Sequence, residues 1–505
     1  MSVLNDILGF FIKRRIERIN EFRINPHDTQ IQQFDSLIYK ARKTEFGKIY
    51  GYADIRNVSD FQNRVPIVSY ETFYPYIERV LKGEQNVLWP STISLFSKSS
   101  GTTNAKSKYI PVSDESLESC HYKGGKDLIT LYLTEYPEAK LFEGKGLSIG
   151  GSLQNNPFNS KTEVGDISAI IMQNLPQWAE YLRTPPIEVA LMDNWGKKLS
   201  KMIEICQKEN LTSILGVPTW TVVFLERLME ETGHENLLEL WPNFELFVHG
   251  AVNFQPYREL FKTKFFPSTD VHYLEIYNAS EGYFAVQDDF SKEGEMLLML
   301  DYGVFYEFIP MEHIEEEHPK TLTIDQVELD KNYAILISTN AGLWRYKIGD
   351  TVKFTSTSPY RIKISGRTKH FINAFGEELI IENAEKGITA ACEATGLSVK
   401  DFTAGPIYMQ GKQKGSHEWI IECNAKPENP SEFIEKLDNT LRRVNSDYDA
   451  KRRGDLALCM PKVHFVNEGT FYSWMEKRGK LGGQNKVPRL SNNREFIEDI
   501  LAFIN

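Results

Sequence analysis

The 505-residue sequence has few cysteines, and no two of them form a recognisable pair. Its five cysteines are scattered along the chain: Cys120, Cys206, Cys392, Cys423 and Cys459. Their number is odd and no C-x-x-C spacing occurs, which argues against a disulfide framework and against a cysteine zinc site. We therefore expect reduced thiols and a cytoplasmic protein.

Long apolar runs and an excess of basic residues are also missing. No segment approaches the ~18 apolar residues that cross a bilayer, and a short apolar run at residues 7–12 precedes the basic cluster at 13–15, whereas a secretory signal places its charges first. We expect an N-terminal amphipathic helix packed on the body, in preference to one lying on a membrane. The net charge of −11 gives no sign of a nucleic-acid partner, and together with the lack of coiled-coil heptads it favours a monomer.

Several common site motifs are absent as well. No G-x-x-x-x-G-K-[ST] loop occurs, and the glycine-rich run GKGLSIGGS at residues 144–152 has the wrong spacing for a dinucleotide loop. We interpret that run as a buried strand that ends in a glycine turn. His313 and His318 flank an acidic run without a third ligand nearby, so we expect a solvated surface segment there and no metal site.

The arrangement of predicted elements indicates an α/β protein with two domains. Through the first 350 residues, helical patterns at 70–81, 193–206 and 219–229 alternate with strand patterns such as 244–248 and 272–277. Beyond residue 366 the pattern changes to a compact α+β unit, with an amphipathic helix at 431–445 and strands at 419–424 and 462–466. We expect a large N-terminal domain at 1–366, with several sheets and flanking helices, and a smaller C-terminal domain at 367–505.

The most distinctive stretch is SSGTTNAKSK at residues 99–108, between strand patterns at 93–97 and 109–112. Hydroxyls, backbone N–H groups and an ammonium are donors that suit phosphate oxygens, and Gly101 lets the backbone approach an anion. The alternative is a surface hairpin loop of the same composition. Composition alone does not separate the two.

Three further segments follow this loop: YNASEG at 277–282, WRYKIGD at 344–350 and GRTKHFI at 366–372. In this order they resemble the core motifs of the adenylate-forming superfamily of acyl-CoA ligases, adenylation domains and luciferases. With the glycine-rich run and GGQNKVPR at 482–489, the chain most resembles the auxin-responsive acyl-acid amido synthetases (the Gretchen Hagen family) and their bacterial relatives. The resemblance covers nearly the whole chain.

The resemblance implies an ATP-dependent ligase with Mg²⁺ as cofactor. A carboxylic acid attacks the α-phosphate of ATP to give an acyl-adenylate and pyrophosphate, and an amine, typically an amino acid, then displaces AMP. This route replaces a poor leaving group by a good one, and preorganised donors stabilise the charge that develops on the phosphates.

The resemblance also implies roles for individual residues. The residues expected to bind the β- and γ-phosphates are those of the loop: Ser99, Ser100, Gly101, Thr102, Thr103 and Lys108. The residues expected to bind the adenine, ribose and α-phosphate are Gly250, Ala251, Tyr277, Asn278, Ala279, Ser280 and Asp350. Glu281 is the expected Mg²⁺ ligand, Arg367 and Lys369 lie at the expected hinge, and Lys486 is expected to reach the α-phosphate and the acyl carboxylate.

The sequence departs from the superfamily pattern at two places and leaves the substrates open. Asn104-Ala105 stand where a second loop glycine is usual, and Gln484-Asn485 precede Lys486, which favours the amido-synthetase branch. An acyl-CoA ligase and a non-catalytic adenylate sensor remain alternatives; Lys412, Lys414, Lys451, Arg452 and Arg453 could serve a coenzyme A phosphate. Candidate walls of the acyl pocket are Trp220, Val223, Phe224 and His249.

Overall fold

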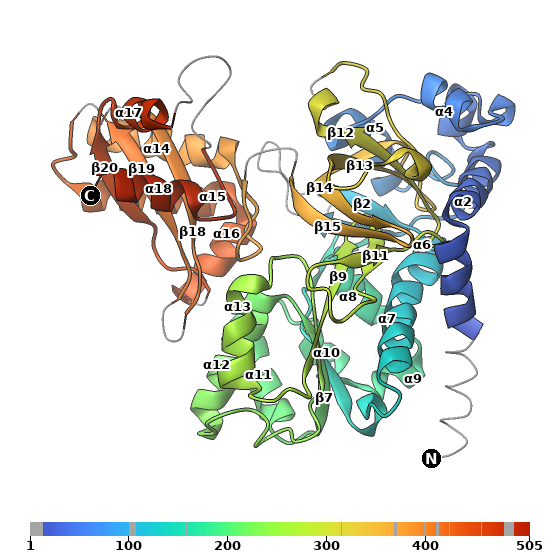
Figure 1. Cartoon of the computed structure of the whole chain (residues 1–505), viewed down its shortest axis with the longest axis horizontal. Coiled ribbons are helices and arrows are strands. Elements are labelled where there is room, and N and C mark those ends of the chain that lie inside the picture. The colour runs from blue at the N-terminus through green and yellow to red at the C-terminus, as the bar shows by residue number, and fades with distance from the viewer. Residues whose placement is uncertain are drawn as a thin grey trace.

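The computed structural model describes residues 14–99, 108–156, 159–314, 316–367, 371–397, 399–410, 414–423, 425–455, 457–478 and 489–504. Figure 1 shows a large body, coloured blue to yellow, and a smaller body, coloured orange to red, beside it. The predicted α/β class, with a large N-terminal part and a smaller C-terminal part, is confirmed. No described helix combines the length and the apolar character that crossing a bilayer requires.

Eleven described strands form the central sheet of the large body, in the order β12-β13-β14-β15-β11-β10-β9-β8-β7-β3-β6. They span Lys145–Ser148 (β3), Arg183–Thr184 (β6), Leu211–Gly216 (β7), Leu246–His249 (β8), His272–Ala279 (β9), Gly282–Val286 (β10), Met296–Leu298 (β11), Val304–Pro310 (β12), Asn332–Thr339 (β13), Tyr346–Thr357 (β14) and Tyr360–Arg367 (β15). Pairing is parallel from β6 to β9 and antiparallel from β9 to β12. The sheet therefore changes its pairing at β9.

A second sheet has the order β2-β1-β5-β4. Its strands are Leu95–Ser99 (β1), Lys108–Val112 (β2), Leu153–Asn155 (β4) and Glu163–Gly165 (β5). β1 and β2 are antiparallel, and Ser99 lies opposite Lys108 at the open end of the pair. The two strands that we expected on either side of the hydroxyl-rich loop are thus confirmed, while residues 100–107 lie outside the described residues.

Helices cover both sheets, and the predicted helices are confirmed in position. The helices of the large body include Pro26–Ala41 (α2), Glu45–Ile49 (α3), Val58–Arg64 (α4), Tyr70–Leu81 (α5), Asp114–Ser116 (α6), Tyr122–Glu135 (α7), Ile167–Gln173 (α8), Gln177–Glu180 (α9), Ile187–Ala190 (α10), Trp195–Cys206 (α11), Pro218–Thr232 (α12) and Gln255–Leu260 (α13). α5 begins where Ser69 and Thr72 form a reciprocal capping box, which satisfies backbone groups that have no partner within the helix. The glycine-rich run contains β3, as predicted, although Leu147 is its one buried residue, and the segment after it at 149–152 is irregular.

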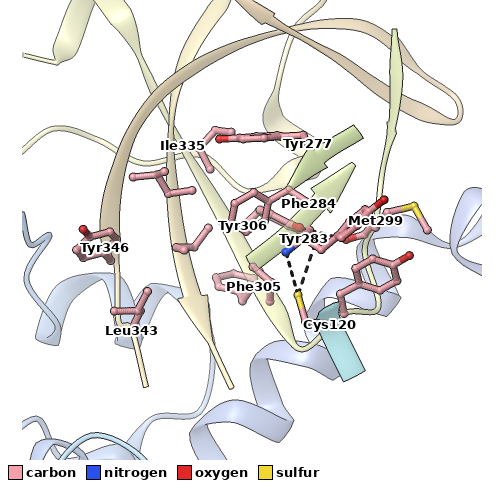
Figure 2. Close-up of a cluster of buried hydrophobic side chains, with 14 of the residues drawn as sticks. Cys120, Tyr277, Tyr283, Phe284, Met299, Phe305, Tyr306, Ile335, Leu343 and Tyr346 are labelled. Carbon is pink, nitrogen blue, oxygen red and sulfur yellow. Dashed lines mark hydrogen bonds between the residues drawn. The ribbon is translucent and has the colours of Figure 1, made fainter. Parts of the chain in front are cut away.

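Buried aromatic side chains join the helices to the antiparallel half of the sheet (Figure 2). Between α6 and α7 the chain makes a π-helical turn at Leu117–His121. The backbone N–H of Tyr283 donates to the Cys120 sulfur at 3.1 Å, which ties β10 to this turn. Around this contact Phe284 and Tyr306 have no exposed surface. The helix therefore fixes the β9–β10 hairpin from one side.

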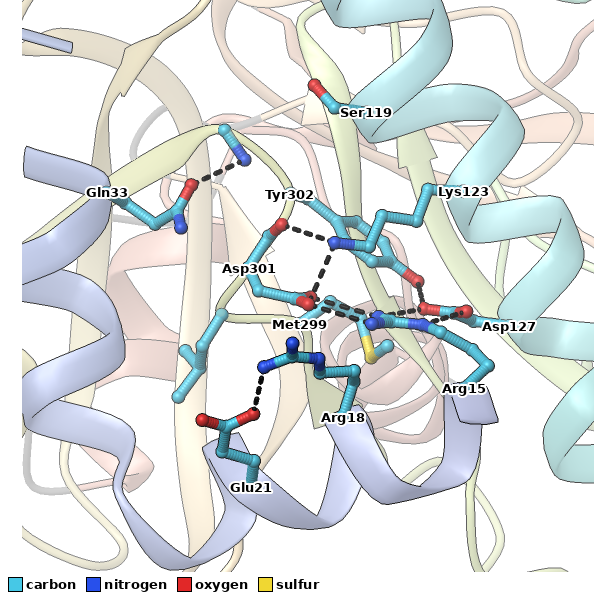
Figure 3. Close-up of polar contacts among 12 residues, drawn as sticks. Arg15, Arg18, Glu21, Gln33, Ser119, Lys123, Asp127, Met299, Asp301 and Tyr302 are labelled. Atoms are coloured by element: carbon cyan, nitrogen blue, oxygen red, sulfur yellow. Dashed lines mark hydrogen bonds and ion pairs between the residues drawn. The ribbon is translucent and has the colours of Figure 1, made fainter. Parts of the chain in front are cut away.

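A helix at residues 14–24 is anchored to the body by buried charges (Figure 3). The Arg15 guanidinium contacts Asp127 on α7 at 2.5 Å and Asp301 at 2.9 Å. The Tyr302 hydroxyl donates to Asp127 at 2.6 Å, and Lys123 contacts Asp301 at 2.8 Å. In the described part of the N-terminal helix, the expectation of a helix packed on the body is confirmed.

The smaller body is built around a three-stranded sheet of order β18-β19-β20, beside the two-stranded pair β16-β17. Its elements are Phe371–Ile372 (β16), Leu379–Ile380 (β17), Ile381–Thr395 (α14), Val399–Ile407 (β18), Ser416–Cys423 (β19), Pro430–Val444 (α15), Ser446–Arg452 (α16), Lys462–Asn467 (β20), Thr470–Lys477 (α17) and Glu495–Ile504 (α18). α15 packs an apolar face of Phe433, Leu437 and Leu441, each fully buried, against α14 and the sheet. The predicted amphipathic helix and the two predicted strands are confirmed.

Candidate active site

The centre of the candidate site is the hairpin between β9 and β10. Tyr277, Asn278 and Ala279 end β9, and Ser280 and Glu281 form the two-residue turn. Because β9 joins the parallel half of the sheet to the antiparallel half, its end lies where strands of both halves converge. The Asn278 side-chain oxygen is buried beside the His121 imidazole. Burial lowers the pKa of His121 to about 4, and a hydrogen bond with the Asn278 side chain opposes part of that shift.

Asp350 lies beside this hairpin although it is far away in the sequence. The Tyr277 hydroxyl donates a 2.6 Å hydrogen bond to the Asp350 carboxylate, across 73 residues of chain. Asp350 belongs to β14 and follows Gly349, whose φ of 101° is in the region that favours glycine. The structure therefore brings the YNASEG and WRYKIGD motifs into direct contact.

The segment after β8 adjoins β9. A Cβ on Gly250 would lie 2.6 Å from the backbone oxygen of Ile276, so the strand leaves room for glycine only. Ala251 follows with a φ of 70°. His249 is buried and packs on Phe254, with ring centroids 4.1 Å apart. Desolvation, with a smaller contribution from Arg258, lowers the pKa of His249 to about 3, so the imidazole is neutral at pH 7.

The ends of the hydroxyl-rich loop are described, but most of the loop is not. Lys108 is 9% exposed, and its ammonium lies 5.6 Å from the centre of the Tyr70 ring. The Tyr70 hydroxyl accepts a hydrogen bond from the backbone N–H of Tyr109 at 2.8 Å, which fixes the start of β2. Ser99 ends β1. The predicted phosphate ligands Ser100, Gly101, Thr102 and Thr103 lie outside the described residues.

The glycine turn after β3 is held by the protein itself. The Lys198 ammonium donates to the backbone oxygens of Gly150 and Gly151 at 2.7 and 3.1 Å, and the N–H of Ser152 donates to Asp166 at 2.8 Å. Burial lowers the pKa of Lys198 to about 8. A Cβ on Gly151 would lie 1.7 Å from an Asp166 oxygen. The glycines thus allow close packing, which agrees with our interpretation of this run.

Three of the candidate walls of the acyl pocket, Trp220, Val223 and Phe224, lie on α12, and the fourth, His249, ends β8. Phe224 has no exposed surface and Val223 is 8% exposed, both within a core that includes Phe247. Trp220, one turn earlier on α12, faces the smaller body instead: the Lys451 ammonium lies 4.3 Å from the centre of its ring. Trp220 therefore lies at the interface between the two bodies.

That interface was not visible in the sequence. Thr219 donates to the backbone oxygen of Phe375 at 3.3 Å, and the Tyr257 hydroxyl donates to that of Ala374 at 3.0 Å. Lys451 is 7% exposed, and burial lowers the pKa of its ammonium. No local pattern marks these residues, because each contact joins segments more than 100 residues apart.

Of the remaining predicted residues, the structure describes Arg367 and Glu281. Arg367 ends β15 and pairs through its backbone with Asp350. Lys369 and Lys486 lie outside the described residues. Glu281 is in the described turn; no group of three His, Cys, Asp or Glu side chains in the described part of the chain could hold a metal by itself.

The mixed sheet, the β9–β10 hairpin and the smaller C-terminal body define the fold of the adenylate-forming ligases. The fold is shared with AtGH3.15 acyl acid amido synthetase in complex with 2,4-DB, with a TM-score of 0.63 at 18% identity over 97% of this chain and 96% of that one. It is shared more distantly with 2-hydroxyisobutyryl-CoA ligase in complex with 2-HIB-AMP and CoA, with a TM-score of 0.57 at 10% identity over 94% and 91% of the two chains.

Within that class, the chain belongs to the GH3 family. The GH3 family N-terminal domain matches residues 15–271, the central domain 297–367 and the C-terminal domain 382–495. The chain is 22% identical to indole-3-acetic acid-amido synthetase GH3.3 of Arabidopsis thaliana, over 95% of this chain and 92% of that protein. It is 24% identical to jasmonoyl–L-amino acid synthetase JAR4 of Nicotiana attenuata, over 94% and 93%.

Proposed function

We propose that this protein is an ATP-dependent acyl-acid amido synthetase. It activates a carboxylic acid as its acyl-adenylate, with release of pyrophosphate, and transfers the acyl group to an amine, an amino acid, with release of AMP. The observation that carries the proposal is the hydrogen bond between Tyr277 and Asp350, since it brings two motifs of a GH3-family chain together at one place. Two relatives that match over nearly their full length are named as an indole-3-acetic acid-amido synthetase and a jasmonoyl–L-amino acid synthetase.

ATP binds across the β9–β10 hairpin. Asp350 accepts hydrogen bonds from the ribose hydroxyls, and Tyr277 holds the carboxylate in place for them. Asn278 borders the adenine, beside Gly250 and Ala251. Ala279 and Ser280 line the path to the α-phosphate. The donors of residues 99–103 and the ammonium of Lys108 receive the β- and γ-phosphates.

Mg²⁺ accompanies ATP. The hairpin fits this ion, because Glu281 places a carboxylate, a ligand that Mg²⁺ prefers, in the turn next to the Ser280 hydroxyl. When bound, Mg²⁺ neutralises phosphate charge. Glu281 holds it there, and Lys486 stabilises the charge on the α-phosphate while the acyl carboxylate attacks.

The chain divides into a large domain at 1–366 and a small domain at 367–505, with Arg367 and Lys369 at the hinge. This division is supported to within a few residues, because β15, the last strand of the large body, ends at Arg367 and β16 of the smaller body begins at Phe371. Trp220 and His249 border the acyl acid, while Val223 and Phe224 shape its pocket from the core behind them. The substrates are small molecules, and the protein acts as a cytoplasmic monomer without nucleic-acid or membrane partners.

An amine acceptor agrees with the structure better than coenzyme A. Of the basic residues that could hold a coenzyme A phosphate, Lys451 and Arg452 are buried, and Arg452 forms a bidentate contact with Asp438 at 2.8 Å. Arg453 contacts Asp449 at 2.9 Å. Lys412 lies outside the described residues, so the contacts of Lys451, Arg452 and Arg453 are what argue against a coenzyme A phosphate here.

The test is pyrophosphate release from Mg·ATP with pooled carboxylic acids and hydroxylamine, which traps an acyl-adenylate as its hydroxamate. Release that depends on an added acid is the expected result, and dividing the pool identifies the acid. Amino acids and coenzyme A are then compared as accelerators of AMP release. ATP binding without acid-dependent release across a broad pool would favour the sensor alternative, and acceleration by coenzyme A alone would favour the ligase alternative.

A further inference from the structure

A cavity of about 640 Å³ opens on the large body, away from the hairpin turn. Its walls come from the end of α7, from α13 and the turn after it, and from the segments on either side of β9 and β10. Tyr273, near the start of β9, lines it, whereas Asn278 lies at the other end of the strand, about 16 Å away at ~3.3 Å per residue. The cavity is of the size that small-molecule sites have.

One wall is aromatic. The rings of Tyr136 and His272 stack with centroids 3.8 Å apart, and Phe290 meets Tyr136 edge-on at 5.2 Å. All three rings are partly exposed at the cavity. Burial lowers the pKa of His272, which keeps this wall uncharged at pH 7. A planar ring is the ligand group that such a wall accommodates.

The opposite wall is cationic and carries polar atoms without partners. Arg258 Nε and the Tyr273 hydroxyl are buried, and neither makes a hydrogen bond to any described residue. The guanidinium is held over the rings of Phe254 and Tyr273, at 5.1 and 5.8 Å from their centres. Lys262 adds a second cation at the rim. Buried donors without partners are costly, so an anion that accepts from them binds favourably.

Two carboxylates of this chain lie near Arg258. Glu293 pairs with it directly: its oxygen lies 2.8 Å from Arg258 Nη1, and its side chain is 47% exposed. Burial raises the pKa of Glu275 and the charge of Arg258 partly opposes that rise, so this carboxylate also senses the guanidinium. Neither contact uses Arg258 Nε or the Tyr273 hydroxyl, which are left for a ligand.

We propose that this cavity is a second binding site, for a small aromatic carboxylate whose ring lies against Tyr136, His272 and Phe290 and whose carboxylate contacts Arg258 and Tyr273. The site is separate from the proposed reaction site, and it does not depend on what reaction that site performs. A bound acid here places an anion next to Phe254, the ring on which His249 packs.

Binding of 2-naphthoate to the full-length protein, followed by equilibrium dialysis and by the fluorescence of the naphthyl ring, tests this. Arg258→Met should weaken binding about tenfold or more, as loss of a charged hydrogen-bond partner does. Glu293→Gln should strengthen binding, because it releases the guanidinium. Lys292→Met is the matched control, since Lys292 is an exposed neighbour that contacts Asp289 and does not line the cavity.

Two comparisons keep the test decisive. The uncharged 2-naphthamide should bind at least about tenfold more weakly than 2-naphthoate, since it lacks the anion. Tyr136→Leu, on the opposite wall, replaces Arg258→Met if the latter does not fold. Unchanged 2-naphthoate binding in Arg258→Met and Glu293→Gln would mean that the probe binds elsewhere, the reaction site included, and would overturn the proposal. Hydroxamate formation, measured in parallel, tests the proposed reaction separately.

Discussion

The Tyr277 hydroxyl and the Asp350 carboxylate meet at 2.6 Å, so the end of β9 and the middle of β14 share one hydrogen bond at the proposed nucleotide site. Tyr277 is 5% exposed and belongs to the aromatic core, next to Phe284 at 5.0 Å. The core therefore positions the tyrosine, and the tyrosine positions the carboxylate. This relationship gives the first prediction.

Tyr277→Phe should raise the KM for ATP roughly tenfold, because a hydrogen bond to a carboxylate contributes about 1.5–3 kcal/mol and its loss frees Asp350 to rotate. Steady-state kinetics with the identified acid measure this. Tyr302→Phe is the matched control: it also removes a 2.6 Å hydroxyl contact to an aspartate, Asp127, but away from the site. An ATP KM that changes equally in both variants, or in neither, contradicts the role of Tyr277.

Glu281→Gln should raise the Mg²⁺ concentration for half-maximal adenylation, on the order of tenfold or more, since a neutral amide is a weaker ligand than a carboxylate. Titration of Mg²⁺ at saturating ATP measures this. Asp289→Asn removes a carboxylate from the loop after β10, where its partner is Ser291, and should leave the titration unchanged. Identical Mg²⁺ curves for Glu281→Gln and the parent would remove Glu281 as a metal ligand.

Gly250→Ala should destabilise the protein by about 1–3 kcal/mol, because the new Cβ lies 2.6 Å from the Ile276 oxygen and must push β8 away from β9. Gly125→Ala is the contrasting variant, since α7 leaves that position without any atom within 4 Å. There the change should stabilise by about 0.5–1 kcal/mol through helix propensity. Thermal unfolding of both variants measures this. A Gly250→Ala variant as stable as the parent would show that the β8–β9 contact can relax.

Arg15→Met should lower the free energy of unfolding by about 3–5 kcal/mol, because it leaves the fully buried Asp127 without its cation. Arg18→Met, one turn along the same helix, removes a pair with Glu21 whose side chains are 64% and 56% exposed, and should change the stability by less than about 0.5 kcal/mol. Figure 3 shows both arginines. Equal melting temperatures for the two variants would mean that Asp127 finds another partner.

The stability of the smaller body should fall in acid because of Glu418. Burial alone would raise its pKa, but hydrogen bonds from Lys462, His464 and Arg494 outweigh burial and lower the pKa to about 2, from an ordinary value of 4.5. A lowered carboxylate pKa stabilises the fold above about pH 4.5, and this stabilisation is lost as the pH falls from 4.5 to about 2.

The contribution of Glu418 to the free energy of unfolding at pH 7 is on the order of 2 kcal/mol after allowance for screening at the exposed Lys462. Denaturant unfolding between pH 2 and pH 7 measures it. Glu418→Gln should be less stable than the parent at pH 7, and the difference between the two should shrink toward pH 2. A constant difference across that range would contradict the assignment to Glu418.

Local patterns predicted the elements well because their causes are local. The period of apolar residues and the cap at Ser69 fix α5, and the alternation at 93–97 fixes β1. The resemblance to a known family assigned the motif 277–282 to nucleotide binding, and the structure places this motif in a tight hairpin turn. Long-range contacts could not be predicted in this way. The pairing of Arg258 with Glu293 and the contact between Trp220 and Lys451 have no signature in sequence spacing.

By itself, the sequence determined the α/β class, the positions of most helices and strands, and the resemblance to the GH3 family, because periodicity and short motifs are properties of neighbouring residues. Only the tertiary structure decided that Phe224 lies in the core while Trp220 lies at the interface, and that Tyr277 meets Asp350. Such contacts depend on how the sheet changes from parallel to antiparallel pairing at β9, and that is set by the packing of the whole chain.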